Sequence, residues 1–119
     1  MTTHQLRIIQ IGSQRLAVFE DDVLTVSDWT EPAPLPFAPA SVLGIVAIEG
    51  RMFTVLDLGD DASTKRSKIV AFRGNEQLAL AVDAASEVRQ HVDEELQVLH
   101  PRSLFATVMK GKERRRRSF

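Results

Sequence analysis

The sequence predicts a mainly β protein built from small barrels, and three observations support this fold class. Short runs of β-branched and large apolar residues recur along the 119 residues, and Gly, Asn, Asp and Ser separate one run from the next. Several of these separations have the length of hairpin turns. One segment near the carboxyl end has helical spacing. We therefore expect roughly seven or eight hairpin-connected strands and one short helix.

The first strands form an opening hairpin. Apolar-rich runs at 7–11 and 15–19 flank a short connection, 12–14, that contains glycine, which is typical of a hairpin with a three-residue loop. The acidic stretch 20–22 then turns the chain. Residues 23–27 place β-branched side chains at alternate positions, which predicts a third strand.

The strongest local signal is a central hairpin, which follows the prolines Pro32, Pro34, Pro36 and Pro39. Strands are expected at 45–48 and 52–58, with Gly44 and Gly50 as turn or hairpin glycines. Gly50 stands where a tight turn requires positive φ at its second central residue. Both arms are apolar at nearly every position, so we expect them inside a barrel or sandwich.

The second half of the chain repeats this pattern after a polar stretch. Residues 59–67 lack periodicity and are interpreted as a loop or linker. A further hairpin is expected from 68–72 and 77–82, and 88–92 alternates apolar and polar residues like a half-exposed strand. A short helix is expected to begin near Pro101.

Composition bounds the class of protein. The size, 13.3 kDa, fits one domain with a modest core, and 44% hydrophobic residues exclude a disordered chain. The absence of cysteine excludes disulfides and thiol chemistry and fits a reducing compartment. The amino terminus lacks the features of a signal peptide, and no apolar run is long enough for a membrane span. We expect a cytoplasmic protein.

Charge is unevenly distributed along the chain. Of 15 basic and 16 acidic residues, six basic and one acidic fall in 110–119, which leaves nine basic and fifteen acidic residues before this segment. Residues 110–119 are expected to form a basic, disordered tail. An alternative function is a small β-barrel that binds nucleic acid or an anionic membrane through this tail. The candidate contacts are Arg114, Arg115, Arg116 and Arg117. The acidic body and the absence of tyrosine argue against this alternative.

No set of residues supports catalysis, and we expect no cofactor and no metal. The histidines His4, His91 and His100 are far apart and have no partner at metal-ligand spacing. Asp57, with Asp60 and Asp61 close behind it, could form a cation site at the end of a strand. For Asp57 and Asp83 the favoured interpretation is structural, because an aspartate after a strand commonly accepts hydrogen bonds from nearby turn amides.

The segment 35–58 has the pattern Leu35-Pro36-x-Ala38-Pro39-x-x-Val42-Leu43-Gly44-Ile45-Val46-x-Ile48-x-Gly50-Arg51-x-x-x-Val55-Leu56-Asp57-Leu58. This pattern resembles the signature segment of CheW-like domains, which are adaptor modules of bacterial chemosensory arrays. Residues 80–88, Leu-Ala-Val-Asp-Ala-Ala-Ser-Glu-Val, and the opening hairpin add to the resemblance, which covers roughly 6–93.

This resemblance implies a CheW-like domain over 1–109, with two SH3-like barrels. Subdomain 1 would cover about 20–66, and subdomain 2 about 67–109 plus the amino-terminal hairpin. It also implies a non-catalytic adaptor that docks on the regulatory domain of a CheA-type histidine kinase, on a chemoreceptor tip, or on a related signalling or motility protein. The candidate partner-binding residues are Val46, Ile48, Glu49, Arg51 and Val55.

Two departures from the family pattern sharpen these expectations. Ala47, Glu49 and Thr54 stand where the family usually has asparagine, arginine and proline. An acid in place of an arginine exchanges hydrogen-bond donors for acceptors, so Glu49 is expected to influence partner choice. The family's last strands have no match after Val92. The second barrel is therefore expected to be incomplete, with open strand edges that favour homo-oligomers or completion by a partner.

Overall fold

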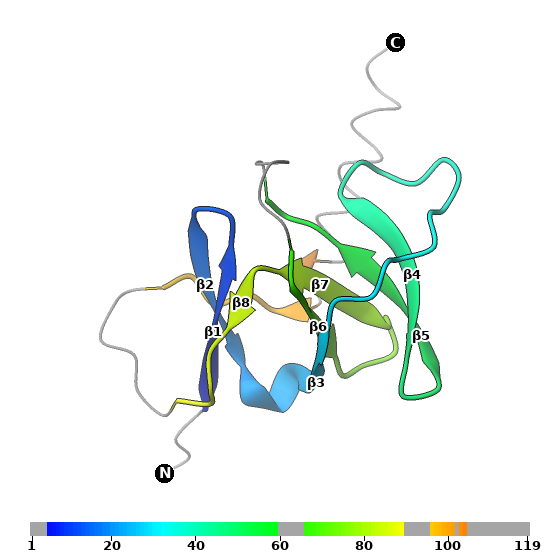
Figure 1. Ribbon diagram of the computed structural model, residues 1–119. Coiled ribbons are helices and arrows are strands. Elements are labelled where there is room, and N and C mark those ends of the chain that lie inside the picture. Colours follow the sequence, from blue (N-terminus) through cyan, green and yellow to red (C-terminus); the bar gives the residue numbers. More distant parts are fainter. Residues whose placement is uncertain (1–4, 60–65, 90–95, 102, 105–119) are drawn as a thin grey trace.

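The computed structural model describes residues 5–59, 66–89, 96–101, 103 and 104, and it confirms a mainly β chain (Figure 1). The strands are β1 (Leu6–Ile11), β2 (Gln14–Phe19), β3 (Val23–Asp28), β4 (Val42–Ile48), β5 (Arg51–Leu56), β6 (Lys68–Phe72), β7 (Leu78–Val82) and β8 (Ala84–Ala85), with a 3-10 turn, η1 (Glu20–Asp22), between β2 and β3. The predicted hairpins are confirmed, since β1 pairs with β2, β4 with β5 and β6 with β7, each antiparallel.

The turn between β4 and β5 has the predicted two-residue form. Ile48 pairs with Arg51, which leaves Glu49 and Gly50 as the two central residues. Their φ angles are +50° and +78°. Positive φ at both positions defines a type I′ turn, whose twist matches that of the flanking strands.

The larger sheet has five strands in the order β3-β6-β7-β5-β4, and β5 runs parallel to β7. Beyond β3, Ala33 exchanges two backbone hydrogen bonds, both 2.9 Å long, with Ile45 on the outer side of β4. The segment that leaves one edge strand therefore pairs with the other edge strand. The chain that follows β3 crosses to the free edge of β4, and one isolated bridge joins it there.

Gly44 has a different role from the predicted one. It lies inside β4, at a shift of strand register between Val42 and Gly44, and not in a turn. A Cβ atom at this position would lie 2.2 Å from the carbonyl oxygen of Ala33. Glycine is therefore required here because the backbone of the proline-rich segment approaches β4 closely.

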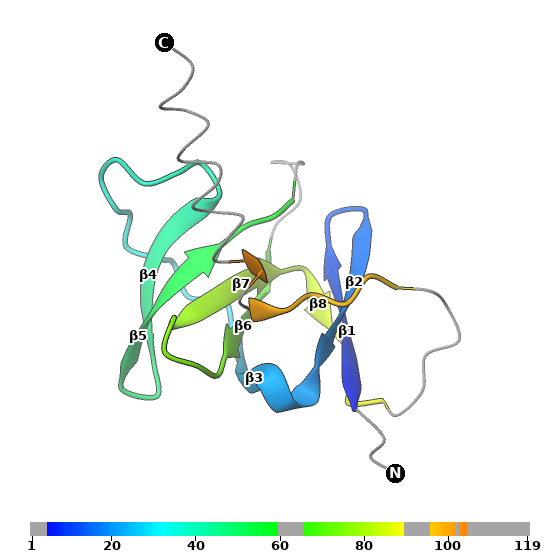
Figure 2. The ribbon, with the colours of Figure 1, turned by 180° about the vertical axis from the view of Figure 1, so that it is seen from behind.

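The smaller sheet has the strand order β2-β1-β8 and lies at the left in Figure 1, opposite the β4–β5 hairpin. Arg89 pairs with Leu6, and Val98 pairs with Ala17 on the outer side of β2 (Figure 2). The strand predicted at 88–92 is not found within its described part, 88 and 89, where Arg89 forms only this single bridge. Its remaining residues lie outside the described ranges. The two-residue strand β8 precedes it.

Two apolar clusters make up the core, and the middle strands contribute to both. One cluster fills the space between the sheets, where Ile9 and Val18 meet Leu80 and Val82. The other lies on the opposite face of the five-stranded sheet, around Phe53. All five residues of β7 are buried, with leucine and valine facing the first cluster and alanine the second.

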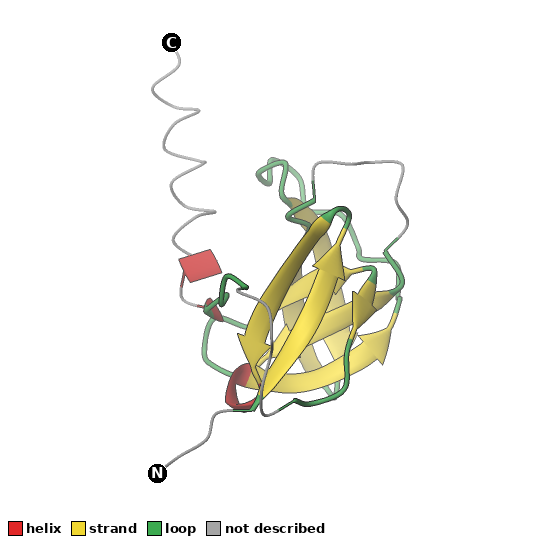
Figure 3. Cartoon of the chain, turned by 90° about the vertical axis from the view of Figure 1, so that its left-hand side faces the viewer, coloured by secondary structure: helices red, strands yellow, loops and turns green. Residues whose placement is uncertain are grey.

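The described helical structure is confined to short segments beside the strands (Figure 3). Pro101, Ser103 and Leu104 are helical, at the place predicted for a helix start, and Leu104 packs into the inter-sheet cluster. The rest of the predicted helix and the 110–119 tail lie outside the described residues. The division into two subdomains stays a prediction, and strand pairing crosses its expected boundary because β6 and β7 join the sheet of β3, β4 and β5.

Candidate functional site

A buried ion cluster connects the two sheets, and we call Asp57, Arg66 and Asp83 the Arg66 cluster. Arg66 Nε donates to Asp57 Oδ1 at 3.2 Å, and its Nη1 donates to Asp83 Oδ1 at 2.8 Å. The Arg66 side chain is only 4% exposed. Asp57 follows β5, Arg66 precedes β6, and Asp83 separates β7 from β8. One guanidinium therefore joins three points that are separated in the sequence.

The carboxylates of the cluster also accept backbone hydrogen bonds. The Gly59 amide donates to Asp57 Oδ1 at 2.9 Å, and the Gly12 amide donates to Asp83 Oδ2 at 2.7 Å. Gly59 is close to Asp57 in the sequence, as in the turn role predicted for this aspartate, whereas Gly12 is 71 positions from Asp83 and belongs to a different turn. Because Gly12 lies in the β1–β2 turn, Asp83 carries the connection from the five-stranded sheet to the smaller one.

The two carboxylates stabilise the positive charge of the Arg66 guanidinium. Burial by itself lowers the pKa of Arg66, but hydrogen bonds and charge from Asp83 and Asp57 outweigh it, so the pKa is raised above its ordinary value. A buried guanidinium needs such partners, because an unpaired one would be strongly destabilising. Sequence reasoning missed Arg66, since it stands in a polar stretch interpreted as a linker.

The cation site suggested for Asp57 is not supported by its surroundings. Its Oδ1 already accepts hydrogen bonds from Arg66 and Gly59, while Asp60 and Asp61 lie outside the described residues. Within the described ranges, no three His, Cys, Asp or Glu side chains lie close enough to hold a metal ion.

Beside the Arg66 cluster is an open groove of about 570 Å³, which we call the Trp29 groove. Its apolar lining comes from Trp29, Pro32, Pro34 and Leu43, with Glu31, Asp57 and Arg66 completing it. Trp29 and Leu43 also pack against the Phe53 cluster. The groove therefore has an apolar wall backed by the core.

The five residues predicted to bind a partner fall into a buried group and a more accessible group. Val46 is 4% exposed and Val55 is 0% exposed, so their side chains belong to the core and not to the surface. Ile48 is half-buried against the same cluster, while Glu49 and Arg51 are exposed at the hairpin tip. Apolar residues in both arms hid this alternation, so the sequence did not show which face points outward.

The outward face of the β4–β5 hairpin carries residues that sequence reasoning missed. Ala47 is exposed and lies opposite Met52, which is 56% exposed. Their positions alternate with those of the buried Val46 and Phe53. The accessible hairpin surface near the tip therefore combines Ala47 and Met52 with the charged Glu49 and Arg51.

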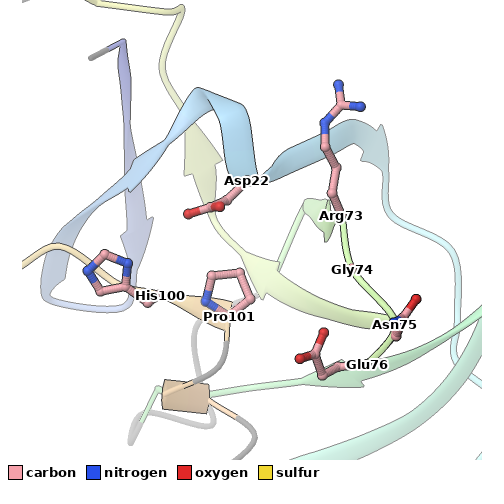
Figure 4. Close-up of a pocket in the computed structure, with 7 residues that line it drawn as sticks. All are labelled: Asp22, Arg73, Gly74, Asn75, Glu76, His100 and Pro101. Atoms are coloured by element: carbon pink, nitrogen blue, oxygen red, sulfur yellow. The ribbon is translucent and has the colours of Figure 1, made fainter. Parts of the chain in front are cut away.

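A second hollow, of about 490 Å³, lies where the β6–β7 turn meets the segment before the helical residues (Figure 4). Asp22, Glu76 and His100 are the ionisable side chains that line it together with Arg73. The Arg73 guanidinium extends away from the other labelled side chains, and its Nε donates to the carbonyl oxygen of Val23 at 3.1 Å. His100 packs against Phe19, with ring centroids 5.5 Å apart. The residues that line this hollow offer no nucleophile with an adjacent base.

The alternative site, Arg114 to Arg117, lies outside the described residues, so polyanion binding through it stays a prediction. Among the helical segments that the structure describes, none has the length and apolar character of a membrane span.

The accessible surface of this small β protein carries an exposed hairpin tip and an apolar groove, while its ion cluster is buried. These are features of a binding module. Residues 5–114 match the family model of the CheW-like domain. The chain belongs to the CheW-like domain family.

Comparisons with individual proteins agree with this assignment. The chain is 28% identical over 100 residues to a chemotaxis protein CheW of Rhizobium meliloti and to a probable chemotaxis protein CheW of Rhizobium etli. Each alignment covers 78% of this chain and 64% of the relative, so the chain spans less than two thirds of their length. A crystal structure of the scaffolding protein TtCheW from Thermoanaerobacter tengcongensis shares the fold, with TM-score 0.64 and 23% identity, over 74% of this chain and 65% of that one.

Proposed function

We propose that this chain is a non-catalytic adaptor of bacterial chemosensory signalling, which docks on the regulatory domain of a CheA-type histidine kinase, on a chemoreceptor tip, or on a related signalling protein. The match of residues 5–114 to the CheW-like domain is the observation that carries this proposal. The two relatives named as chemotaxis proteins support the same pathway.

The proposed docking surface is the outward side of the β4–β5 hairpin tip. Glu49 and Arg51 are exposed there, and Ala47 and Met52 supply apolar area beside them. In an interface of this kind the small apolar centre contributes affinity, and the charged residues around it contribute selectivity. Val46 and Val55 act indirectly in this proposal, because they fix the hairpin from the core side.

We further propose that the chain forms two SH3-like barrels and that the second is incomplete. The five-stranded sheet, whose β4 edge is bridged by Ala33 from the segment after β3, supports the first barrel. The smaller sheet has three strands within the described residues, which supports an open second barrel. Since Val98 already pairs with the outer edge of β2, the edge at β8 is the one that would pair with a partner chain in this proposal.

Calorimetric titration tests the adaptor role. A CheA-type regulatory domain or receptor tip from the same organism should bind at micromolar concentration, and Glu49→Arg should change the affinity by about tenfold or more because it reverses a charge at the interface. Glu87→Arg is the matched control, since Glu87 is exposed but lies after β8. Absence of binding to either partner would remove the adaptor role.

A further inference from the structure

The Trp29 groove carries more negative than positive charge. Three ionisable residues line it, namely Glu31, Asp57 and Arg66. The Arg66 guanidinium is already bonded to Asp57 and Asp83, and its side chain is 4% exposed. One guanidinium against two carboxylates leaves the Arg66 cluster with an excess of one negative charge, and Glu31 adds a second. The groove therefore attracts a cation.

Both acidic side chains of the lining can accept further hydrogen bonds. Glu31 is exposed, and its carboxylate makes no hydrogen bond or ion pair with any residue that the structure describes. The bonds that Asp57 accepts from Arg66 and Gly59 both end on Oδ1. Its Oδ2 accepts none from the described part of the chain, and the side chain is 23% exposed. Since a carboxylate has about four acceptor positions, the groove offers acceptors to a donor from outside.

The remaining lining suits the stem of a long basic side chain. Trp29 is half-buried, and Pro32, Pro34 and Leu43 complete the apolar wall of this 570 Å³ groove. Arginine and lysine bury their methylene groups against such a wall while the charged head reaches a polar group. The face of a tryptophan ring also attracts a cation. The wall and the two acids together match an apolar stem that ends in a positive charge.

The same features favour arginine over other side chains. A guanidinium is planar and more weakly hydrated than an ammonium group, so it stacks on an aromatic ring and leaves water more readily. It also donates two parallel hydrogen bonds to one carboxylate. An acidic side chain would be repelled by Glu31 and Asp57, and an apolar one would cover their carboxylates without supplying a donor.

The surface that adjoins the groove is apolar and uncharged. Pro34 is followed by Leu35, which is 39% exposed, and Phe37 is 101% exposed. No charged residue occurs from Pro32 to Ile48, so this side of the groove has no cation to repel an arginine. Exposed apolar surface beside the groove favours a segment whose arginine has apolar neighbours.

We propose that the Trp29 groove is a docking site for an arginine side chain of a partner protein, in a segment where apolar residues flank the arginine. The guanidinium lies against Trp29 and donates to Glu31 and to Asp57 Oδ2. A single pocket buries less area than a standard interface, so an isolated segment binds weakly. The groove shares no residue with the hairpin tip, and this proposal does not rest on the kinase or receptor docking proposed there.

Nuclear magnetic resonance titration of the full chain tests the site, because the indole N–H of Trp29 gives one signal from the sole tryptophan. The probe is acetyl-Leu-Arg-Leu-amide. It should shift this signal with a dissociation constant of about 1 mM or tighter. The same peptide with citrulline, which is planar but neutral, should bind at least about fivefold more weakly. Equal binding of the two peptides, or no shift at about 10 mM probe, would overturn the proposal.

A charge variant separates the groove from the general attraction of an acidic protein for a cation. Glu31→Gln should weaken binding of the arginine peptide about three- to fivefold, because it removes one carboxylate and keeps the size of the side chain. Glu49→Gln is the matched control, since it makes the same change at the exposed hairpin tip, and it should leave the affinity within about twofold of the wild type. Equal weakening by both variants, with thermal unfolding unchanged, would show a non-specific attraction and contradict the assigned site.

The other candidate occupant is the arginine run of the chain itself, Arg114 to Arg117. Replacing all four by glutamine in the full chain should change the affinity for the arginine peptide by less than about twofold, because the groove is open to a partner. A gain of about tenfold or more on this replacement would show that the run competes for the groove, and it would overturn the assignment to a partner protein.

Discussion

Arg66 Nη1 lies 2.8 Å from Asp83 Oδ1, although the two residues are 17 positions apart in the sequence, one just before β6 and the other just after β7. The Ser67 amide also donates to the carbonyl oxygen of Val82 at 2.9 Å. The hairpin is thus closed at its open end by backbone and side chain together. Asp57 extends the same contact to β5, so the geometry at the junction of the two sheets depends on one arginine.

Replacing Arg66 alone should be strongly destabilising. Arg66→Met leaves two carboxylates without their buried partner, and we expect a loss of about 3 kcal/mol in the free energy of unfolding by urea titration. The triple variant Arg66→Met, Asp57→Asn, Asp83→Asn removes the charges together and should lose less than the single variant. Lys68→Met is the control, because it breaks an exposed ion pair with Asp28. A triple variant less stable than Arg66→Met would contradict the charge argument.

The effects of substitutions at Gly59 and at Arg66 on the free energy of unfolding should be coupled. A Cβ atom at Gly59 would lie 1.9 Å from Arg66 Nη2, so Gly59→Ala must displace the guanidinium or the loop, at a cost of about 1–3 kcal/mol. In the Arg66→Met background most of this cost should vanish. A double-mutant cycle on the free energy of unfolding measures the coupling, and strictly additive effects would show that the predicted clash does not form.

Two hairpin glycines should differ in their tolerance of alanine. Gly44→Ala meets the Ala33 carbonyl at 2.2 Å, whereas a Cβ atom at Gly50 meets nothing within 4 Å. Gly50→Ala therefore loses only the conformational freedom needed at φ +78°, about 1 kcal/mol. Gly44→Ala should cost clearly more, because the backbone cannot move aside without breaking the Ala33 to Ile45 pairing. Equal shifts of the midpoint of urea unfolding would refute this ranking.

The exposed ion pair between Asp28 and Lys68 should contribute a small amount to folding stability that is lost in acid. The hydrogen bond and charge of Lys68 lower the pKa of Asp28. A lowered folded-state pKa stabilises the protein above the unfolded pKa, near pH 4, and this stabilisation is lost as the pH falls through the folded pKa. Asp28→Asn should thus melt slightly below the wild type at pH 6 and low salt, and the gap should close well below pH 4. A gap that persists at pH 2 would disprove the assignment.

Local chemistry explains what the sequence could predict. The three hairpins depend on turn residues that act over a few positions, such as Gly50, whose positive φ was expected. The outward-facing side chains of β4 and β5 were harder to predict, because strands with apolar residues on both faces give no period-two signal. Val46 and Val55 were included among the predicted partner-binding residues, while Ala47 and Met52 were missed.

The features that could not be predicted from the sequence depend on contacts between residues far apart in the chain. The parallel pairing of β5 with β7 and the approach of Ala33 to Gly44 depend on where the whole chain places its segments. Arg66 looked like a solvated linker residue, since nothing near it in sequence indicates that Asp57 and Asp83 converge on it. Phe37 occupies an unspecified position of the family pattern, between the matching residues Pro36 and Ala38. Its exposure became evident only from the fold.

The pairing of Val98 with β2 has a consequence for synthesis of the chain. The Ala17 amide donates to the carbonyl oxygen of Gln97 at 2.9 Å, and the Leu99 amide donates to the carbonyl oxygen of Ala17 at 2.8 Å, so β2 pairs with a segment that is translated much later than β2 itself. The five-stranded sheet needs only residues up to 82 and can form earlier on the ribosome. Until translation passes residue 99, the outer edge of β2 remains open to aggregation or to a chaperone.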